Sequence, residues 1–160
     1  MQLKNFLGKK IKGNVLLFNP DSFLLNNLSA SAKYIALKSD KKKCGGKCQI
    51  MEDLSLRSAL KMADMALISP YSIGESKIYS RMGAELVAEA AKKQNIPVYV
   101  CGSYWMVDRK NVFKKWEKLE SDALFFEKIN PDLITGIISE LGIFKHHIFM
   151  QELANTHPWI

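Results

Sequence analysis

SRMGAELVAEAAKKQNIPVYVC, residues 80–101, is the stretch that decides the fold of this chain. Met82, Leu86 and Ala90 recur in it every four residues, and this spacing predicts a helix over residues 79–95 with one apolar face. The last turn is cationic and polar, which suits the negative end of the helix dipole, and the following proline prevents continuation. The run VYVC after that proline is typical of a short buried strand. A helix, a proline that ends it and a buried strand, in this order, form half of a parallel βαβ unit.

Three more apolar runs predict buried strands of the same sheet. They lie at Val15–Phe18, Tyr34–Leu37 and Met65–Ile68, and each ends in a polar or proline-containing loop. We expect them to neighbour the strand at Val98–Cys101 in one mostly parallel sheet, with the helix packed on it through its apolar face. Strands alternating with helices over short links predict an α/β, Rossmann-like fold with helices on both faces of the sheet and right-handed crossovers.

Polar capping residues predict further helices. Asp21 or Ser22 can cap a short helix, Asp53 can cap the helix that follows it, and Asn130 can cap a helix that begins at a proline and runs to Gly142. Polar, glycine-containing stretches predict loops instead. The ranges expected are helices at 54–62 and 149–153, loops at 39–48 and 72–77, strands at 48–51 and 125–127, and a basic amphipathic stretch at 107–119.

Positive charge is concentrated in the first third of the chain. The net charge is +7, but residues 1–47 hold ten lysines against two aspartates, a balance of +8, whereas the rest holds thirteen bases and fourteen acids, a balance of −1. Such lysines either form a solvated face or bind RNA, the ribosome or an acidic protein. Both alternatives stay open, since lysines without interleaved arginines and aromatics are a weak signal for nucleic acid.

Length and composition limit the classes of protein to which the chain can belong. A chain of 160 residues can bury a real core, and we expect one domain over residues 14–160 after a short extension at residues 1–13. No run of 18 apolar residues is present, so no membrane span is expected. Three cysteines without a secretion signal predict reduced thiols and a cytoplasmic location.

Neither a metal nor a cofactor is expected. Cys44 and Cys48 supply two thiols four residues apart, which is only half of a zinc site, and a surface hairpin or turn is the preferred interpretation. The histidines at 146, 147 and 157 are far away and lack ligand spacing. No Gly-x-x-x-x-Gly-Lys-Ser/Thr loop is present to cradle a nucleotide phosphate.

Four pieces of the sequence, in their order and spacing, carry a family resemblance. They are Asp53 and Asp64, eleven residues apart and followed by a buried strand; the turn at 80–83; the run at 96–101; and the stretch INPDLI at 129–134 with ELG at 140–142. From about Asn14 onward the chain therefore resembles the C-terminal domain of the regulatory subunits of eukaryotic initiation factor two-B. That family also holds ribose-bisphosphate isomerases and methylthioribose-phosphate isomerases.

The resemblance implies a Rossmann-like domain of the ribose-phosphate isomerase and CoA-transferase kind that forms oligomers. It implies a non-catalytic regulatory subunit, of alpha, beta or delta type, that packs against sister subunits and engages initiation factor two during guanine-nucleotide exchange. The alternatives are a sugar-phosphate isomerase or phosphosugar-binding protein, and an RNA- or ribosome-associated protein. The helical N-terminal domain usual in the family is expected to be absent, because only about 13 residues precede the first strand.

Two positions separate a binding subunit from an enzyme. In the isomerases that the chain resembles, a cysteine after the first strand and an aspartate after the third are thought to handle proton transfer. The matching positions here are Pro20 and Tyr71. Proline cannot act as acid, base or nucleophile, and a phenol, with an ordinary pKa of ~10, is a poor base. The resemblance therefore implies no isomerase activity, with Asp21 as the neighbouring carboxylate that could substitute.

A residual anion site is a further expectation. Arg81 and the amides near Gly83 are expected at a helix N-terminus, where dipole and donors favour phosphate. Asn19 and Ser22, in the loop after the first strand, are the other candidate ligands. The alternative for Arg81 is an ordinary surface or interface arginine.

An apolar contact surface is expected near the C-terminus. Phe144, Phe149 and Trp159 are candidates for apolar surface that a single α/β layer leaves uncovered. An exposed patch of that kind usually marks a partner site. We therefore expect a homo- or hetero-oligomer with the C-terminal segment at or near the contact.

Overall fold

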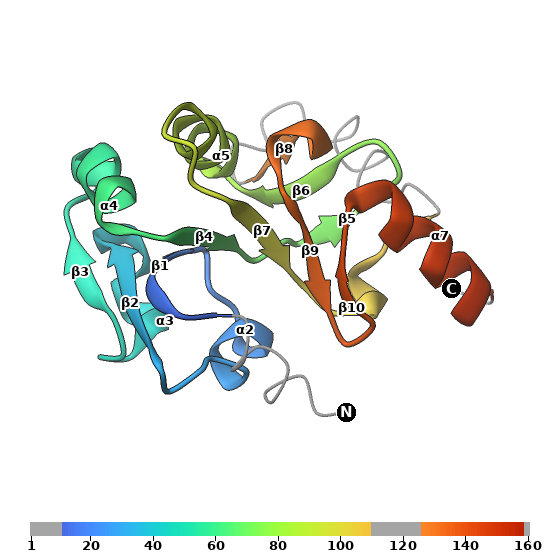
Figure 1. The fold of residues 1–160 in the computed structure, drawn as a ribbon, viewed down its shortest axis with the longest axis horizontal. Helices are drawn as coiled ribbons and strands as arrows, with labels where there is room; N and C mark the ends of the chain where they lie inside the picture. Colours follow the sequence, from blue (N-terminus) through green and yellow to red (C-terminus); the bar gives the residue numbers. More distant parts are fainter. Residues whose placement is uncertain (1–10, 110–125, 159–160) are drawn as a thin grey trace.

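The computed structural model describes residues 11–109 and 126–158, and a mixed sheet of seven strands forms its centre (Figure 1). The strand order is β10-β9-β7-β4-β1-β2-β3, and every neighbouring pair is parallel except β10 with β9. The predicted strands are confirmed as the neighbours β7, β4, β1 and β2. The bounds are β1 Gly13–Phe18, β2 Ala32–Leu37, β3 Gln49–Met51, β4 Met65–Ile68, β7 Val98–Cys101, β9 Gly136–Ser139 and β10 Gly142–Phe144.

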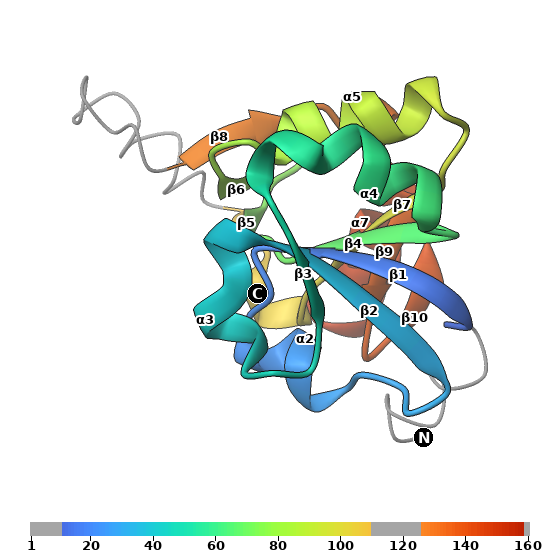
Figure 2. The ribbon, with the colours of Figure 1, turned by 90° about the vertical axis from the view of Figure 1, so that its left-hand side faces the viewer.

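Helices cover both faces of this sheet, as expected. Figure 2 shows α4 (Leu56–Met62) and α5 (Ala84–Lys93) over one face and α2 (Ser22–Asn26) and α3 (Lys41–Cys44) over the other. Alternate residues of β1 face the two sides, so Leu16 and Phe18 join the apolar cluster of α4 and α5, while Val15 and Leu17 join that of α2 and α3. The last helix, α7 (His146–Thr156), contributes its buried residues to the α4–α5 cluster.

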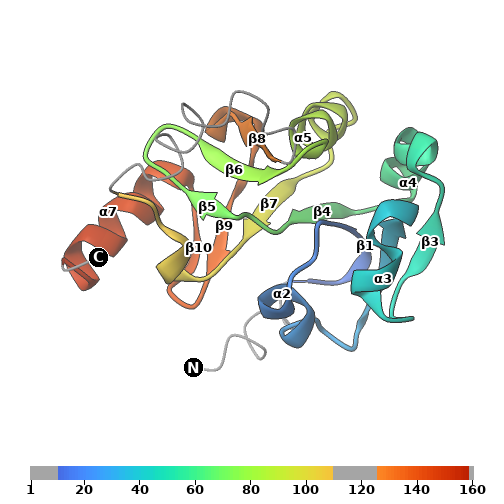
Figure 3. The same cartoon turned by 180° about the vertical axis from the view of Figure 1, so that it is seen from behind.

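A second, smaller sheet lies beside α5 and is absent from the sequence-based expectation. Its strands β5 (Ser72–Ile73), β6 (Ile78–Arg81) and β8 (Phe126–Ile129) pair antiparallel in that order (Figure 3). The predicted loop at 72–77 is therefore confirmed only over residues 74–77, and the first turn of the predicted helix is wrong. Gly83, with a left-handed φ of 96°, makes the corner between β6 and α5.

The helix α5 packs through a different face from the one predicted. Ala84, Val87, Ala88 and Ala91 are buried, whereas Met82 and Leu86 are 48% and 61% exposed. The buried set has the i, i+3, i+4, i+7 spacing of one helix face, and its small side chains allow close approach to the sheet. The longer side chains are left pointing outward.

The predicted helix from Asn130 to Gly142 is also wrong. The asparagine cap is real, because its side chain accepts from the Asp132 amide at 3.0 Å, but only a 3-10 turn, η4 (Pro131–Leu133), follows. The chain then forms β9, which is buried along its whole length, and β10. The sequence ITGII over 134–138 is rich in β-branched residues, and these favour a strand that is buried between neighbours.

Smaller differences concern the segments around β3. The predicted loop at 39–48 begins with a 3-10 turn, η1 (Lys38–Asp40), and the short helix α3. Asp53 does not cap α4; it lies in the 3-10 turn η2 (Asp53–Ser55) and accepts from the Ser39 amide at 3.0 Å. Most of the predicted amphipathic stretch at 107–119 lies outside the described residues, apart from the start that follows η3 (Tyr104–Met106).

The predicted C-terminal contact surface is corrected as well. Phe149 is fully buried, because it packs with Leu153 in the core cluster. Its side chain is therefore not exposed to a partner. Phe144 is half-buried, and Trp159 lies outside the described residues. The expected helical stretch at 149–153 is confirmed as the middle of α7.

Candidate functional site

The main pocket opens at the carboxyl ends of β1 and β4. It has a volume of about 500 Å³, and its wall is formed by the loops after β1, β4 and β7 and by α3. Parallel α/β sheets place their ligands at this edge. The residues that matter for its chemistry are Asn19, Pro20, Asp21, Ser22, Lys43 and Tyr71.

Asn19 is the central polar residue of this pocket. It is buried and has a left-handed φ of 52°, which an asparagine tolerates better than most residues. Its amide donates to Oδ2 of Asp40 at 3.0 Å, its Nδ2 donates to the Ser69 carbonyl at 3.1 Å, and its Oδ1 accepts from Lys43 Nζ. The loop after β1 is therefore fastened to α3 and to the end of β4.

Asp40 ties this loop to Arg81. The carboxylate is fully buried, and its Oδ2 lies 3.0 Å from a guanidinium nitrogen of Arg81. The guanidinium also stacks over the Phe18 ring, 4.5 Å from its centre, and donates to Ser39 Oγ at 3.2 Å. Arg81 is thus committed to an internal ion pair and a cation–π contact.

A carboxylate of the same chain already binds the N-terminal end of α5. The Glu85 amide, in the first turn, donates to Oε1 of Glu127 on β8 at 2.6 Å. An acidic side chain there complements the positive end of the helix dipole. The two features expected to hold an anion, Arg81 and the start of α5, therefore already have carboxylate partners within the chain: Asp40 for the Arg81 guanidinium and Glu127 for the Glu85 amide.

The four predicted anion ligands do not line one pocket, although Asn19 and Arg81 both bind Asp40. Asn19 and Ser22 line the main pocket, whereas Arg81 and Gly83 line a separate depression of about 370 Å³ between α4 and α5. That second depression is mostly apolar, with Leu56, Met82, Leu86 and Val87 in its wall.

Pro20 and Tyr71 do come together, because both line the main pocket. The neighbouring Asp21 is engaged in structural bonds: its Oδ1 accepts from the Leu24 amide at 2.8 Å, which caps α2, and from Ser69 Oγ at 3.2 Å. General acid–base catalysis needs an acid or base of suitable pKa within hydrogen-bond reach of the substrate. At the two positions matched to the isomerase residues, the pocket offers a proline and a phenol.

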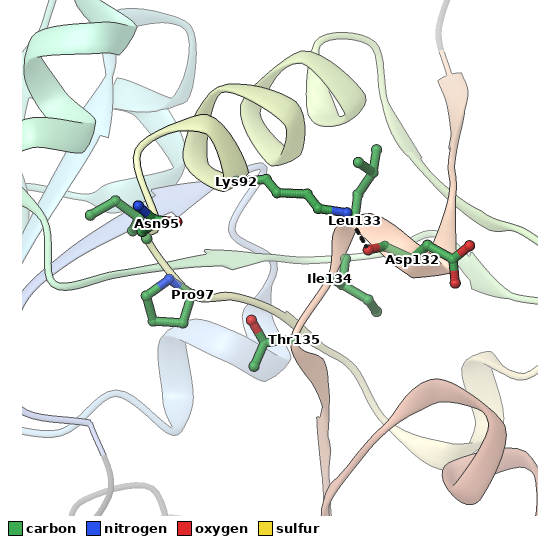
Figure 4. Close-up of a pocket in the computed structure, with 8 residues that line it drawn as sticks. Lys92, Asn95, Pro97, Asp132, Leu133, Ile134 and Thr135 are labelled. Carbon is green, nitrogen blue, oxygen red and sulfur yellow. Dashed lines mark hydrogen bonds between the residues drawn. The ribbon is translucent and has the colours of Figure 1, made fainter.

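A further pocket, of about 330 Å³, lies at the opposite edge of the sheet (Figure 4). It is formed where α5 ends and β7 and β9 begin, with Pro97 and Thr135 in its wall. Its lysine, Lys92, donates to the main-chain carbonyl of Asp132 at 3.1 Å and so joins α5 to η4. The hydrogen bond between Lys92 and Asp132 thus has a structural role at the amino ends of the strands.

Residues 11–109 and 126–158 contain no group of three or more side chains that could hold a metal ion. Over the same residues, no helix combines the length and apolar character needed to cross a bilayer.

Asp40, Lys43 and Ser69 are the site residues that the sequence did not reveal. An isolated aspartate just past a buried strand and inside a lysine run was the available signal for Asp40, since that position falls at the carboxyl edge of the sheet. Lys43 is one of three consecutive lysines, and nothing in the sequence distinguishes it from its neighbours. The helix α3 turns it toward Asn19.

Solved structures that are similar to this fold include eIF2B subunits and a methylthioribose-phosphate isomerase. Superposition gives a TM-score of 0.74 with eIF2B beta from Chaetomium thermophilum, at 15% identity over 96% of this chain and 52% of that one. The tetrameric eIF2B-beta2-delta2 complex from C. thermophilum gives 0.70, at 14% identity over 96% and 58%. The 5-methylthioribose 1-phosphate isomerase from Pyrococcus horikoshii OT3 gives 0.71, at 12% identity over 97% and 58%.

Sequence comparison points to the same group. A protein from Methanothermobacter thermautotrophicus, named for methylthioribose-1-phosphate isomerase activity, is 33% identical in a match that covers 51% of this chain and 33% of that protein. No family model matches the chain. The predicted resemblance is thus confirmed: the fold is that of eIF2B subunits and methylthioribose-phosphate isomerases. The chain spans about a third of the sequence relative and little more than half of each solved structure.

Proposed function

We propose that this chain is a non-catalytic binding subunit of the eIF2B regulatory type, acting in translation initiation through contacts with sister subunits and initiation factor two. The observation that carries the proposal is the main pocket, where Pro20 and Tyr71 occupy the two positions matched to the isomerase acid–base pair. The guanidinium of Arg81 and the start of α5 are neutralised internally, which weakens the case for a tightly held phosphate. Any nucleotide-exchange chemistry then belongs to another subunit.

The surface proposed for association is the outer side of α4 and α5, here called the α4–α5 face. It is defined by the exposed apolar residues Leu54, Met62, Met82 and Leu86. Met82 and Leu86 also line the apolar depression of about 370 Å³ between the two helices. Exposed apolar clusters of this kind mark protein contacts more often than solitary exposed leucines do.

A second subunit of this same fold is the occupant that suits the α4–α5 face. The exposed residues of α4 include Arg57 and Lys61, while the outward side of α5 carries Glu89. A two-fold axis between two copies brings the α4 of one subunit opposite the α5 of the other. Basic and acidic side chains then meet around an apolar centre, which is the usual anatomy of a stable interface.

Sedimentation of the purified chain at tens of micromolar tests this association. Leu86→Glu puts a charge at the centre of the α4–α5 face and is expected to weaken association by about 30-fold, which corresponds to about 2 kcal/mol for a central interface residue. Gln151→Glu adds the same charge on the exposed side of α7 and serves as the matched control. A chain that stays monomeric, or a dimer that Leu86→Glu leaves intact, contradicts the proposed surface.

Binding of a phosphosugar without turnover is the second candidate function. The observation that favours it is the Lys43 ammonium, which lies in the wall of the main pocket beside Asn19. Titration with methylthioribose-1-phosphate by calorimetry, with Lys43→Ala and the exposed Lys61→Ala as a matched pair, tests it. Saturable heat that only Lys43→Ala reduces supports binding, and equal heats for both variants contradict it.

RNA or ribosome binding rests on the lysine-rich first third alone. The lysines of α3 and Lys47 are exposed and available to phosphates. Phosphate contacts by lysines weaken steeply as salt rises, because counterions are released on binding. A filter-binding series on single-stranded RNA from low to high salt separates this function from subunit association through the apolar α4–α5 face.

A further inference from the structure

The sequence CGGKC at 44–48 forms a tight turn between α3 and β3. Cys44 ends α3, and Cys48 directly precedes the first residue of β3. Gly45 and Gly46 have φ values of 56° and 82°, and the Lys47 amide donates to the Cys44 carbonyl at 3.0 Å. Two consecutive left-handed residues closed by such a bond are the geometry of a type I′ turn, which glycines adopt at no steric cost. The turn brings the chain back so that the two cysteines share one side of it.

The two thiols meet at the edge of the core. Both lie in the apolar cluster beneath β1 and β2, where Cys44 is 1% exposed and Cys48 is half-buried. Both are free thiols, and they lie near enough for each to shift the pKa of the other. This proximity lowers the pKa of Cys44 below that of an ordinary thiol and raises the pKa of Cys48, because the pair gives up its first proton more readily than its second.

The surroundings of the pair suit an anionic thiol reagent. Lys41, Lys42, Lys43 and Lys47 are exposed on the same turn and helix. Lysines near a thiol favour thiolate and attract anionic reagents. The third cysteine, Cys101, differs in each respect: it is fully buried in β7, and its pKa is raised by burial.

We propose that Cys44 and Cys48 are a reversible disulfide site, oxidised by small anionic disulfides such as glutathione disulfide. The half-exposed Cys48 passes its proton to the neighbouring Cys44 sulfur and attacks one sulfur of glutathione disulfide; a mixed disulfide forms, and one glutathione leaves as its thiolate and takes up that proton. The buried Cys44 thiolate then attacks the Cys48 sulfur and releases the second glutathione. Two protein thiols are oxidised, one glutathione disulfide is reduced to two glutathione thiols, and the two protein protons pass to the departing thiolates.

The position of the pair connects its redox state to the main pocket. Cys44 directly follows Lys43 in α3, and the Lys43 ammonium holds the Asn19 side chain. The same short helix follows Asp40, which holds the Asn19 amide and Arg81. A disulfide at the end of α3 therefore fixes the helix that organises the pocket wall.

Equilibration of the native chain in glutathione buffers, followed by acid quench, alkylation and peptide mass spectrometry, tests the proposal. The expected result is a Cys44–Cys48 disulfide at ratios of glutathione disulfide to glutathione that leave Cys101 reduced. Cys44→Ser is expected to stop at the mixed disulfide on Cys48, and Cys48→Ser to leave Cys44 unmodified, because a buried thiol is out of reach. The urea-unfolded chain is expected to need about ten-fold more oxidising buffer, since folding holds the thiols at high effective concentration.

Two outcomes overturn the proposal. One is that the native chain keeps both thiols reduced, or stops at the Cys48 mixed disulfide as the Cys44→Ser variant does. The other is that the folded and urea-unfolded chains close at the same ratio, which means that the fold does not bring the thiols together. The urea comparison uses the unsubstituted chain, so it decides the question even where a cysteine variant fails to fold. Cys101→Ala, which removes the third thiol, is expected to behave as the unsubstituted chain.

Discussion

At the scale of single residues, Asp40 holds the candidate site together. Its buried carboxylate accepts from the Asn19 amide after β1 and from the guanidinium of Arg81, the last residue of β6, and these two residues lie 62 positions apart in the chain. Burying a charge is costly unless it is paired and hydrogen-bonded. The ion pair of Asp40 and Arg81 therefore fixes the geometry of the loops at the carboxyl edge. It also occupies the Arg81 guanidinium, which is then less available to bind an anion.

Asp40→Ala is expected to lower the free energy of unfolding by about 3 kcal/mol, the lower end of the range for breaking a buried pair. The lower end applies because the Arg81 side chain keeps 22% of its surface exposed and can recover some hydration. Urea denaturation followed by circular dichroism measures the change. Glu52→Ala, which breaks the solvent-exposed pair of Lys38 and Glu52, is the control and is expected to cost under about 1 kcal/mol. Equal losses in the two variants contradict this role of Asp40.

At the scale of elements, the parallel strands β1, β2, β4 and β7 could be predicted from the sequence, whereas the strand β9 beside β7 could not. Apolar runs such as Met65–Ile68 leave few alternatives to a buried strand. The same rule fails at 134–138, because apolar residues at that spacing also suit a helix, and only tertiary pairing with β7 decides for β9. For α5, the long side chains Met82 and Leu86 dominate the pattern, but close packing on the sheet selects the alanines.

Some features of the candidate site could likewise be predicted from the sequence, and others could not. The positions of Pro20 and Tyr71 in one pocket were predictable, since both follow parallel strands at the same edge of the sheet. The pairing of Asp40 with Arg81 was not, because it joins η1 to β6, and the sequence shows neither the strand β6 nor its direction. That residues 14–160 form a single domain stays a prediction.

The element α7 is anchored by a histidine whose charge state matters. His146 Nε2 lies 2.8 Å from the Gly74 carbonyl, and the neutral ring donates that bond. Burial lowers the pKa of His146, and the carbonyl bond and Asp132 oppose this while His147 adds to it. The unfolded chain therefore binds the proton more readily, so this contribution to stability is present above a pH of about 6.5 and is lost as the pH falls.

Urea unfolding at a pH of about 7.5 and of about 5.5 measures this dependence. The unsubstituted chain is expected to lose stability between the two, and His146→Gln is expected to lose less because the titrating group is gone. His147→Gln, at the exposed neighbouring position, is the control and is expected to keep most of the dependence, because burial lowers the pKa of His146 more than His147 does. An unchanged pH dependence in His146→Gln means that another group is responsible.

At the scale of the whole molecule, the chain combines the fold of eIF2B subunits and methylthioribose-phosphate isomerases with a pocket that holds Pro20 and Tyr71, the residues that we match to the isomerase acid–base pair. Arg81 and the start of α5 are paired internally with carboxylates, whereas the α4–α5 face is apolar and exposed. Loss of general acid–base help costs on the order of 10²–10⁴-fold in rate per group. With both groups lost, the chain is expected to act by binding.

The most direct test is isomerase turnover by the purified full chain, with methylthioribose-1-phosphate and ribose-1,5-bisphosphate as substrates. The account predicts no rate above the uncatalysed background, before and after Asp21→Asn. Turnover well above background that Asp21→Asn abolishes, while the folded structure persists by circular dichroism, makes Asp21 the catalytic group in place of Pro20 and Tyr71 and contradicts the account.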